Sequence, residues 1–202
     1  MIYAVERAIR RLNNQDLMFR VNKDSIPRIE KLIIYSQAFF LKCLYSLIYP
    51  YFYYCNIVWA STYKTNIRQP VILQRRRIIR IMNKSHFNAR TDPIFKDLGI
   101  LKFNGIHLLQ LGQFMYSCKN SFLPPTFNNN FSQSNQFHSC NTRNSQAYRP
   151  PYCRTNTKKF SRFFQGPKFF NSLDNKVINS QPLSSFKKNL KIKLLSKYEN
   201  SL

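Results

Sequence analysis

One stretch, residues 44–63, constrains the fold of this chain more than any other: LYSLIYPYFYYCNIVWASTY. Most of its side chains are aliphatic or aromatic, so leaving it in water would expose a large apolar surface. Of the 202 residues in the chain, 44% are hydrophobic and 15% are aromatic, which is enough to build a core. We therefore expect the chain to fold at least in part, with most of the aromatic residues of this stretch in its core.

Helical periodicity extends through residues 28–119. The pattern predicts helices at 28–49, 51–60, 69–84, 92–96 and 105–118. Pro50 is expected to end the first helix, Asp92 and Asn104 to cap the last two, and Gly99 to follow the short one. The predicted fold class is mainly α, with a small helical bundle, then a long polar loop or disordered segment, and a C-terminal basic helix.

Composition divides the chain into four parts. They are a divergent polar lead-in at 1–27, the helical bundle at 28–119, a polar loop or linker at 120–159 that is partly disordered, and a Phe-rich turn with a basic helix at 160–202. Gly166 and Pro167 indicate the turn. The basic helix is expected at 183–198, with Ser184 and Ser185 as candidate caps. Its buried face is predicted to comprise Phe186, Leu190 and Leu194.

The charge is strongly unbalanced, with 32 Lys and Arg against eight Asp and Glu and a formal net charge of +24. Such a surplus predicts attraction to phosphate-bearing partners, with nucleic acid first among them, although a generic basic protein has the same composition. A projection of the third helix at about 100° per residue places Val71 and Ile78 opposite Arg76, Arg77 and Arg80. We expect the basic edge to contact a sugar-phosphate backbone without sequence choice.

The predicted nucleic-acid contacts lie in three parts of the chain. They are Arg75, Arg76, Arg77, Arg80 and Lys84 in the third helix, Arg143, Arg149 and Arg154 in the polar segment, and Lys187, Lys188 and Lys191 in the last helix. Tyr148 and Tyr152 accompany the arginines of the polar segment. Either tyrosine could stack on a base of a single strand or a structured RNA, or remain an ordinary loop residue.

The residue inventory argues against an enzyme. The eight acids include no adjacent or alternate pair that could hold two metal ions for nucleotidyl transfer. Four glycines form no phosphate-binding loop, and no catalytic signature surrounds the three histidines. We expect no catalytic residue, no cofactor and no small-molecule substrate.

The five cysteines form no close pair, which favours a reducing compartment over a disulfide framework. A zinc site could use Cys118, His138, Cys140 and Cys153, but their spacing is irregular, so no metal is expected. The amino terminus lacks a secretory signal pattern, and we expect an intracellular location, cytoplasmic or nuclear.

A membrane span is an alternative reading of residues 32–60, which are long and apolar enough to cross a bilayer. Lys42, Pro50 and Asn56 argue against it, so we do not expect a membrane partner. Two further readings stay open: a small basic membrane-associated protein whose cationic tail meets anionic lipid, and a decayed reading frame without function.

Several blocks resemble one family when taken in order. They are LYSLIYPYFYYCNIVWASTY, ILQRRRIIRIM, HFNARTDPIFKDLGILKF, IHLLQLGQFMYS, FLPPTF, HSCNTRNSQAYRPPYCRT and KFSRFFQGPKFFNSL before SFKKNLK. Between residues 44 and 195 they are similar to the region after the polymerase core in jockey-type LINE reverse transcriptases, which are RNA-directed DNA polymerases of non-LTR retrotransposons. The resemblance implies a helical thumb-side and tail region that grips template RNA or a primer-template duplex.

The family's catalytic palm turn, an aromatic residue followed by Ala-Asp-Asp, has no counterpart in this sequence. We therefore expect a truncated C-terminal portion of such a reverse transcriptase, which binds RNA or DNA backbone and has no polymerase activity of its own. Whether it associates with an intact reverse transcriptase cannot be read from these residues.

Overall fold

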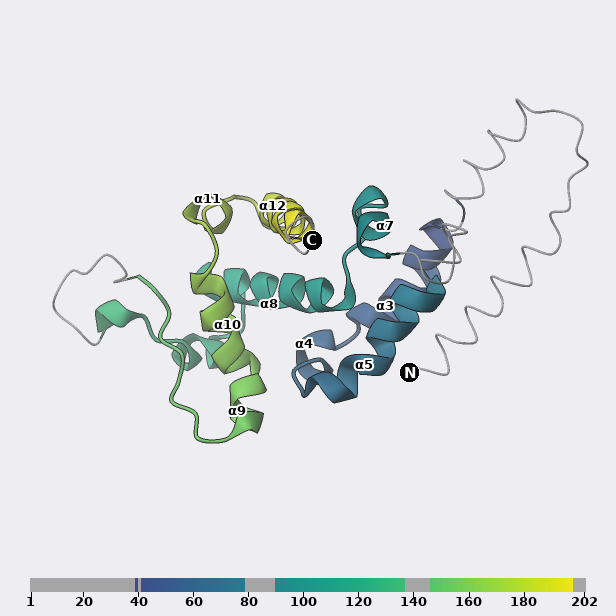
Figure 1. The fold of residues 1–202 in the computed structure, drawn as a ribbon. Coiled ribbons are helices and arrows are strands. Elements are labelled where there is room, and N and C mark those ends of the chain that lie inside the picture. The colour runs from purple at the N-terminus through teal and green to yellow at the C-terminus, as the bar shows by residue number, and fades with distance from the viewer. Residues whose placement is uncertain (1–38, 40, 79–89, 137–145, 198–202) are drawn as a thin grey trace, which may run out of the picture. The chain divides into compact units, whose positions relative to one another are not determined.

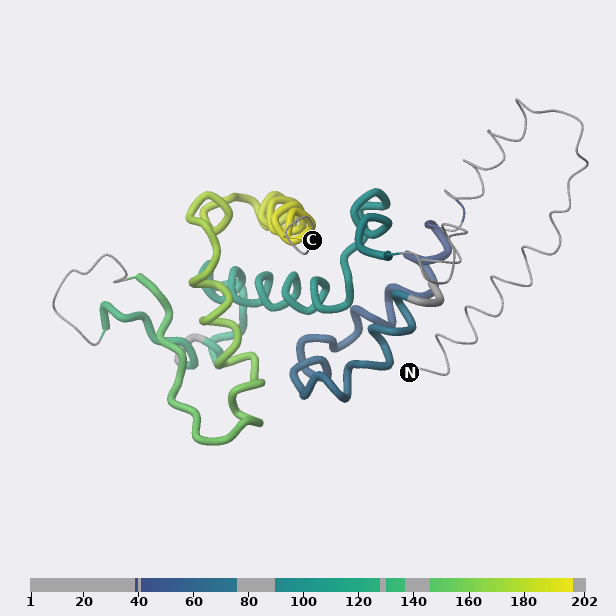
Figure 2. Tube along the Cα trace, viewed as in Figure 1, coloured from purple at the N-terminus to yellow at the C-terminus, as the bar shows by residue number. Residues whose placement is uncertain are grey.

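The computed structural model describes residues 39, 41–78, 90–136 and 146–197. These residues are mostly helical, and the described ranges contain no strand apart from an isolated bridge between Gln133 and Tyr148. The mainly α prediction is confirmed. The chain divides into two compact units built from interleaved segments, which Figure 2 traces by residue number. Unit 1 comprises 1–54 and 68–103, and unit 2 comprises 55–67 and 104–202.

Unit 1 contains π-helical turns as well as α-helices. Its elements are η1 (Leu44–Ile48), α3 (Tyr49–Tyr53), the end of α5 (Lys64–Ile72), η2 (Leu73–Ile78) and α7 (Asp92–Asp97). Pro50 does not stop a helix, because η1 continues directly into α3 and Pro50 lies in the first turn of α3. The chain leaves the helix at Tyr54, and Cys55 follows with a φ of 49°.

The core of unit 1 includes a buried polar side chain, Gln74, which the helical projection did not predict. Its Nε2 donates to the Leu101 carbonyl at 3.0 Å, and its Oε1 accepts from the Phe103 N–H at 2.6 Å. The Tyr49 hydroxyl donates to the same Leu101 carbonyl at 3.0 Å. Leu73 at the start of η2 is also buried, whereas Val71, which lies in α5, is only half-buried. A π turn has a different rotation per residue, so the 100° projection does not hold through η2.

The short helix α7 and its end largely follow the sequence pattern. Asp92 is the first residue of α7 rather than its cap, which is Thr91, and Pro93 follows within the first turn. Gly99 has a φ of 59°, the left-handed conformation expected after a helix. Buried Ile94 and Phe95 join α7 to the unit 1 core.

Unit 2 is organised around one long helix, α8 (Phe103–Lys119), which reaches back to include Asn104, the residue predicted to cap it. Its other elements are α4 (Asn56–Trp59), η3 (Pro125–Asn130), η4 (Ser134–Gln136), α9 (Asn156–Phe160), α10 (Arg162–Asn171), α11 (Asn175–Ile178) and α12 (Leu183–Ser196). Figure 1 shows α10 crossing α8 and α12 lying beside it. Burial on several sides of α8 explains why Ile106, Leu109, Leu111 and Met115 are all in the core.

Two glycines allow the helices of unit 2 to approach closely. A Cβ at Gly112 of α8 would lie 2.5 Å from Leu190 Cδ2 of α12, and a Cβ at Gly166 of α10 would lie 2.7 Å from Met115 Sδ of α8. The predicted turn at Gly166 and Pro167 is therefore wrong: both residues are buried inside α10. Packing against α8 stabilises a helix where the local sequence favours a turn.

The polar segment after α8 also contributes to the core. Phe131 and Tyr148 are buried, and their rings meet edge to face at 6.3 Å. Phe131 further contacts Phe114 of α8 and Phe163 of α10, with ring centroids 5.9 and 5.6 Å apart. The described parts of residues 120–159 thus contain single buried aromatic residues between stretches of polar surface.

Candidate nucleic-acid interface

The predicted contacts of the third helix lie in unit 1, and only Arg75 has a described side chain. Its Nη2 lies 3.4 Å from Asp92 Oδ1, and its Nε lies 3.3 Å from Thr91 Oγ1. Lys102 Nζ is 3.0 Å from the same Asp92 oxygen. At this position the basic edge has an acidic neighbour, Asp92, which the sequence analysis did not predict.

The structure gives no side-chain contacts for the other predicted cations of the third helix. Arg76 and Arg77 belong to η2, where only their backbone is described, and Arg80 and Lys84 lie outside the described residues. The basic edge of this helix therefore stays a prediction.

Three lysines of α12 lie on one side of this helix in unit 2. Phe186, Leu190 and Leu194 are buried, as predicted. In a helical projection at about 100° per residue, Lys187 lies next to this buried face. Lys191 and then Lys188 follow further around the helix, away from the buried face. Lys187 and Lys188 are exposed and Lys191 is half-buried. We refer to these three residues as the lysine arc.

Lys193 lies on the other side of the same helix and has a partner. Its Nζ lies 2.6 Å from Asp174 Oδ2, so one end of α12 is held to the residue preceding α11. Lys193 is therefore not counted in the lysine arc. It is an exposed pair, and such pairs contribute little to stability.

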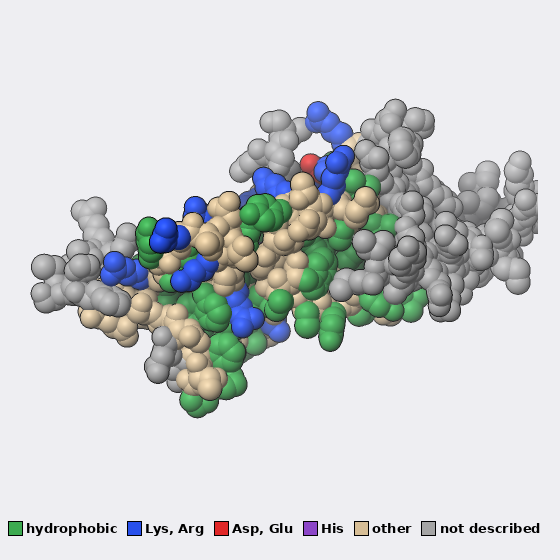
Figure 3. Space-filling view, turned by 90° about the horizontal axis from the view of Figure 1, so that it is seen from below, with side chains coloured by type: hydrophobic (Ala, Val, Ile, Leu, Met, Phe, Trp, Pro, Cys, Tyr) green, Lys and Arg blue, Asp and Glu red, His purple; other side chains and the backbone are tan. Residues whose placement is uncertain are grey.

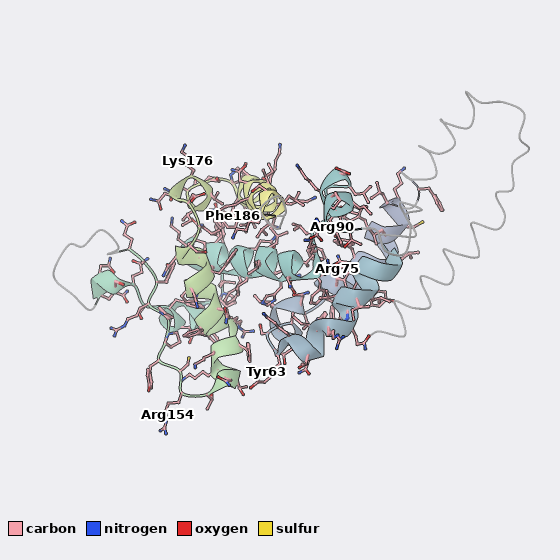
Figure 4. The ribbon with its side chains drawn as sticks, in the orientation of Figure 1. Tyr63, Arg75, Arg90, Arg154, Lys176 and Phe186 are labelled. Atoms are coloured by element: carbon pink, nitrogen blue, oxygen red, sulfur yellow. The ribbon has the colours of Figure 1, made fainter. Side chains whose placement is uncertain are left out.

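A second group of cations follows Tyr148. Arg149 and Arg154 are exposed, as are Lys158 and Lys159 in α9, whereas Arg143 lies outside the described residues. Figure 4 shows Arg154 pointing away from the body of unit 2, on the side of α8 opposite Phe186 and α12. The structure therefore does not bring Arg154 together with the lysine arc: Arg154 and α12 lie on two sides of α8.

Acidic side chains are scarce around both groups. Asp174 is the single acidic residue among the described residues of unit 2, and it is paired with Lys193. On the face drawn in Figure 3, Lys and Arg atoms are far more extensive than Asp and Glu atoms. Such an imbalance produces a positive potential that attracts polyanions.

The two tyrosines of the polar segment have opposite environments. Tyr148 is buried, and burial is the main cause that raises the pKa of its phenol. Its backbone N–H and carbonyl pair with the Asn171 side chain at 3.1 and 2.7 Å. Of the two readings left open for this residue, stacking on a base does not fit a buried ring. Tyr152 is 84% exposed.

Arg162 is a cation in an unusual environment, which the sequence analysis missed. Its guanidinium carbon lies 5.0 Å from the Phe163 ring centroid and 5.7 Å from that of Phe114. The Nε atom is buried without a hydrogen-bond partner. The sequence signal was an arginine placed directly before two phenylalanines. Its cation–π contacts place this positive charge at the aromatic core rather than with the surface cations.

His107 is a half-buried structural residue of unit 2. Its Nδ1 lies 3.1 Å from Oδ1 of Asn56, which is fully buried. Burial lowers the pKa of His107, and a hydrogen bond to Asn56 acts in the opposite direction. Gln110 Oε1 accepts from the Ile57 N–H at 3.2 Å, so two polar contacts fasten α4 to α8.

The described residues contain no group of three or more His, Cys, Asp and Glu side chains that could hold a metal ion. Cys43, Cys55, Cys118 and Cys153 are free thiols, while His138 and Cys140 lie outside those residues. Within the same described ranges, we find no helix with the length and apolar character that a membrane crossing requires.

Comparisons with protein-family models, with curated proteins and with solved structures found no match. The resemblance to LINE-type reverse transcriptases therefore rests on the sequence blocks alone.

Proposed function

We propose that this chain binds the backbone of RNA or DNA, as a post-polymerase portion of a LINE-type reverse transcriptase without catalytic residues of its own. The observation that carries the proposal is the charge distribution of unit 2. The lysine arc is presented by a well-packed helix, and the one described acid of the unit is paired with Lys193 on another side of that helix.

Lysines suit this role because backbone binding needs no fixed hydrogen-bond pattern. An ammonium group that meets a phosphate displaces condensed counterions, so affinity is gained without sequence choice and falls as salt is raised. The arc has three such groups, and α12 is fixed to α8 by its buried side chains. Binding therefore requires little ordering of the backbone.

The test is a salt series of nucleic-acid binding with matched charge variants. The arc variant carries Lys187→Gln, Lys188→Gln and Lys191→Gln. The control carries Lys119→Gln, Lys168→Gln and Lys176→Gln, which remove the same charge from other positions of unit 2. We expect the arc variant to bind more weakly, with a slope of log K against log salt that is shallower by about 2 to 3.

The control decides between a site and bulk charge. If both variants lose the same affinity and slope, total charge explains the binding and the arc is not a site. A third variant with Arg76→Ala, Arg77→Ala and Arg80→Ala tests the third helix in the same way. Tighter binding to anionic vesicles than to nucleic acid would favour the membrane-associated alternative.

A further inference from the structure

Tyr152 is the most exposed of the large hydrophobic side chains that the structure describes. Its exposed fraction of 84% means that its ring stabilises the fold through almost no burial. Buried Phe131, Tyr148 and Phe170 are close in the chain or in space, so this region contains an aromatic core that Tyr152 does not join.

The backbone that leads to Tyr152 is held in place. Both backbone polar groups of Tyr148 are paired with the Asn171 side chain, and the Arg149 N–H donates to the Ser132 carbonyl at 2.9 Å. Two prolines then follow, and their rings fix φ immediately before Tyr152.

The backbone after Tyr152 is held as well. Cys153 Sγ donates to the Pro151 carbonyl at 3.3 Å, and the Thr155 hydroxyl accepts from the Lys158 N–H at 3.4 Å, which caps α9. Phe160 at the end of α9 contacts the Tyr63 ring with centroids 4.7 Å apart. The exposed ring is thus presented by a fixed segment rather than by a loose loop.

The surroundings of Tyr152 along the chain are cationic. Arg154, Lys158 and Lys159 are exposed, and the sequence contains no Asp or Glu between Asp97 and Asp174. A fixed, solvent-facing aromatic ring beside several cations has the chemistry of a platform on which one base stacks while its phosphates meet the cations.

We infer that Tyr152 stacks on an unpaired base, so that the preferred ligand of this side of unit 2 is a single-stranded nucleic acid. The inference rests on the proposed function and names its ligand class. Duplex bases are already stacked inside the helix and present only their edges, so a single protruding ring gains little from a duplex.

The test uses the full chain with single-stranded oligo(dT) of about 15 nucleotides and a duplex DNA of the same length. We expect Tyr152→Ala to weaken oligo(dT) binding about 10-fold and to leave duplex binding unchanged. Tyr152→Phe keeps the ring and should bind as the wild type does. Phe122→Ala removes another exposed ring of unit 2 and is the matched control.

The outcomes separate the inference from the proposed function. If the wild type binds oligo(dT) and Tyr152→Ala binds it equally well, the stacking inference is overturned and backbone binding stands. An equal loss for oligo(dT) and duplex would also overturn it, because it indicates a general surface contact. If the wild type binds neither ligand at low salt, the proposed function itself fails.

Discussion

Adding one methyl group at Gly112 tests how α12 packs on α8, and therefore where the lysine arc lies. In a helix interior, Gly→Ala usually stabilises by about 1 kcal/mol. Here the added Cβ would lie 2.5 Å from Leu190 Cδ2, 3.4 Å from Phe169 Cε1 and 3.8 Å from Phe186 Cζ. Leu190 and Phe186 are fully buried, so neither can move away freely.

The balance of the two effects fixes the sign of the change. Overpacking a core costs about 1 to 3 kcal/mol, which outweighs the helix-propensity gain. We expect Gly112→Ala to lower the free energy of unfolding by about 1 kcal/mol, measured in urea by the helical circular dichroism signal. Gly166→Ala is the comparison: its Cβ would meet the flexible Met115 side chain, so the loss should be smaller.

A second background makes the test sharper. Leu190→Ala alone should destabilise by about 2 to 5 kcal/mol, because it leaves a cavity at a fully buried position. In that background the clash is gone, so Gly112→Ala should stabilise by about 1 kcal/mol. A stabilising Gly112→Ala in the otherwise wild-type chain would refute the close approach of α12 to α8.

Two other predictions concern polar groups in the cores. Gln74→Leu removes the hydrogen bonds of this side chain to the Leu101 carbonyl and the Phe103 N–H, and it should destabilise by about 1 to 3 kcal/mol in urea unfolding. An unchanged midpoint would contradict the role of this side chain. Burial lowers the pKa of His107, so the unfolded chain takes up this proton at higher pH than the folded one. Stability should be complete above a pH of about 6.5 and fall as pH drops through that value. His107→Gln should remove this component from a urea series across pH, and an identical pH dependence in both proteins would exclude it.

The last helix shows what the sequence could predict. Its expected range of 183–198 compares with an observed Leu183–Ser196, and the predicted buried face is correct. The signal was strong because apolar residues at four-residue steps alternate with lysines over the whole helix. Ser184 and Ser185 are not its caps, since the helix begins at Leu183 after Pro182.

Gly166 and Tyr148 differ from what their local sequence suggests for one physical reason, which is contact with residues distant in the sequence. Gly166 and Pro167 favour a turn locally, but the close contact with Met115 places them in a helix. Tyr148 lies in a polar stretch, yet Asn171 pairs with its backbone and Phe131 covers its ring. Spacing and composition contain no information about such partners.

The candidate site could be predicted only where it depends on composition and period and not on tertiary contacts. The charge surplus and the lysine arc follow from composition and period, which the sequence displays directly. The acidic neighbour of Arg75 could not be predicted in this way. Asp92 is 17 residues away in the chain and approaches Arg75 only through the packing of η2 and α7 in unit 1.

Two acids of the described residues, Asp92 and Asp174, are paired with cations. Asp92 pairs with Arg75 and Lys102, and Asp174 pairs with Lys193, so each of these two carboxylates lies beside cations of its own unit. In unit 2, the lysine arc and the cations around Tyr152 lie on opposite sides of α8 (Figure 4). If the chain binds nucleic acid as proposed, two cationic groups on different sides of one helix suit an extended polyanion better than a compact anion bound at one point.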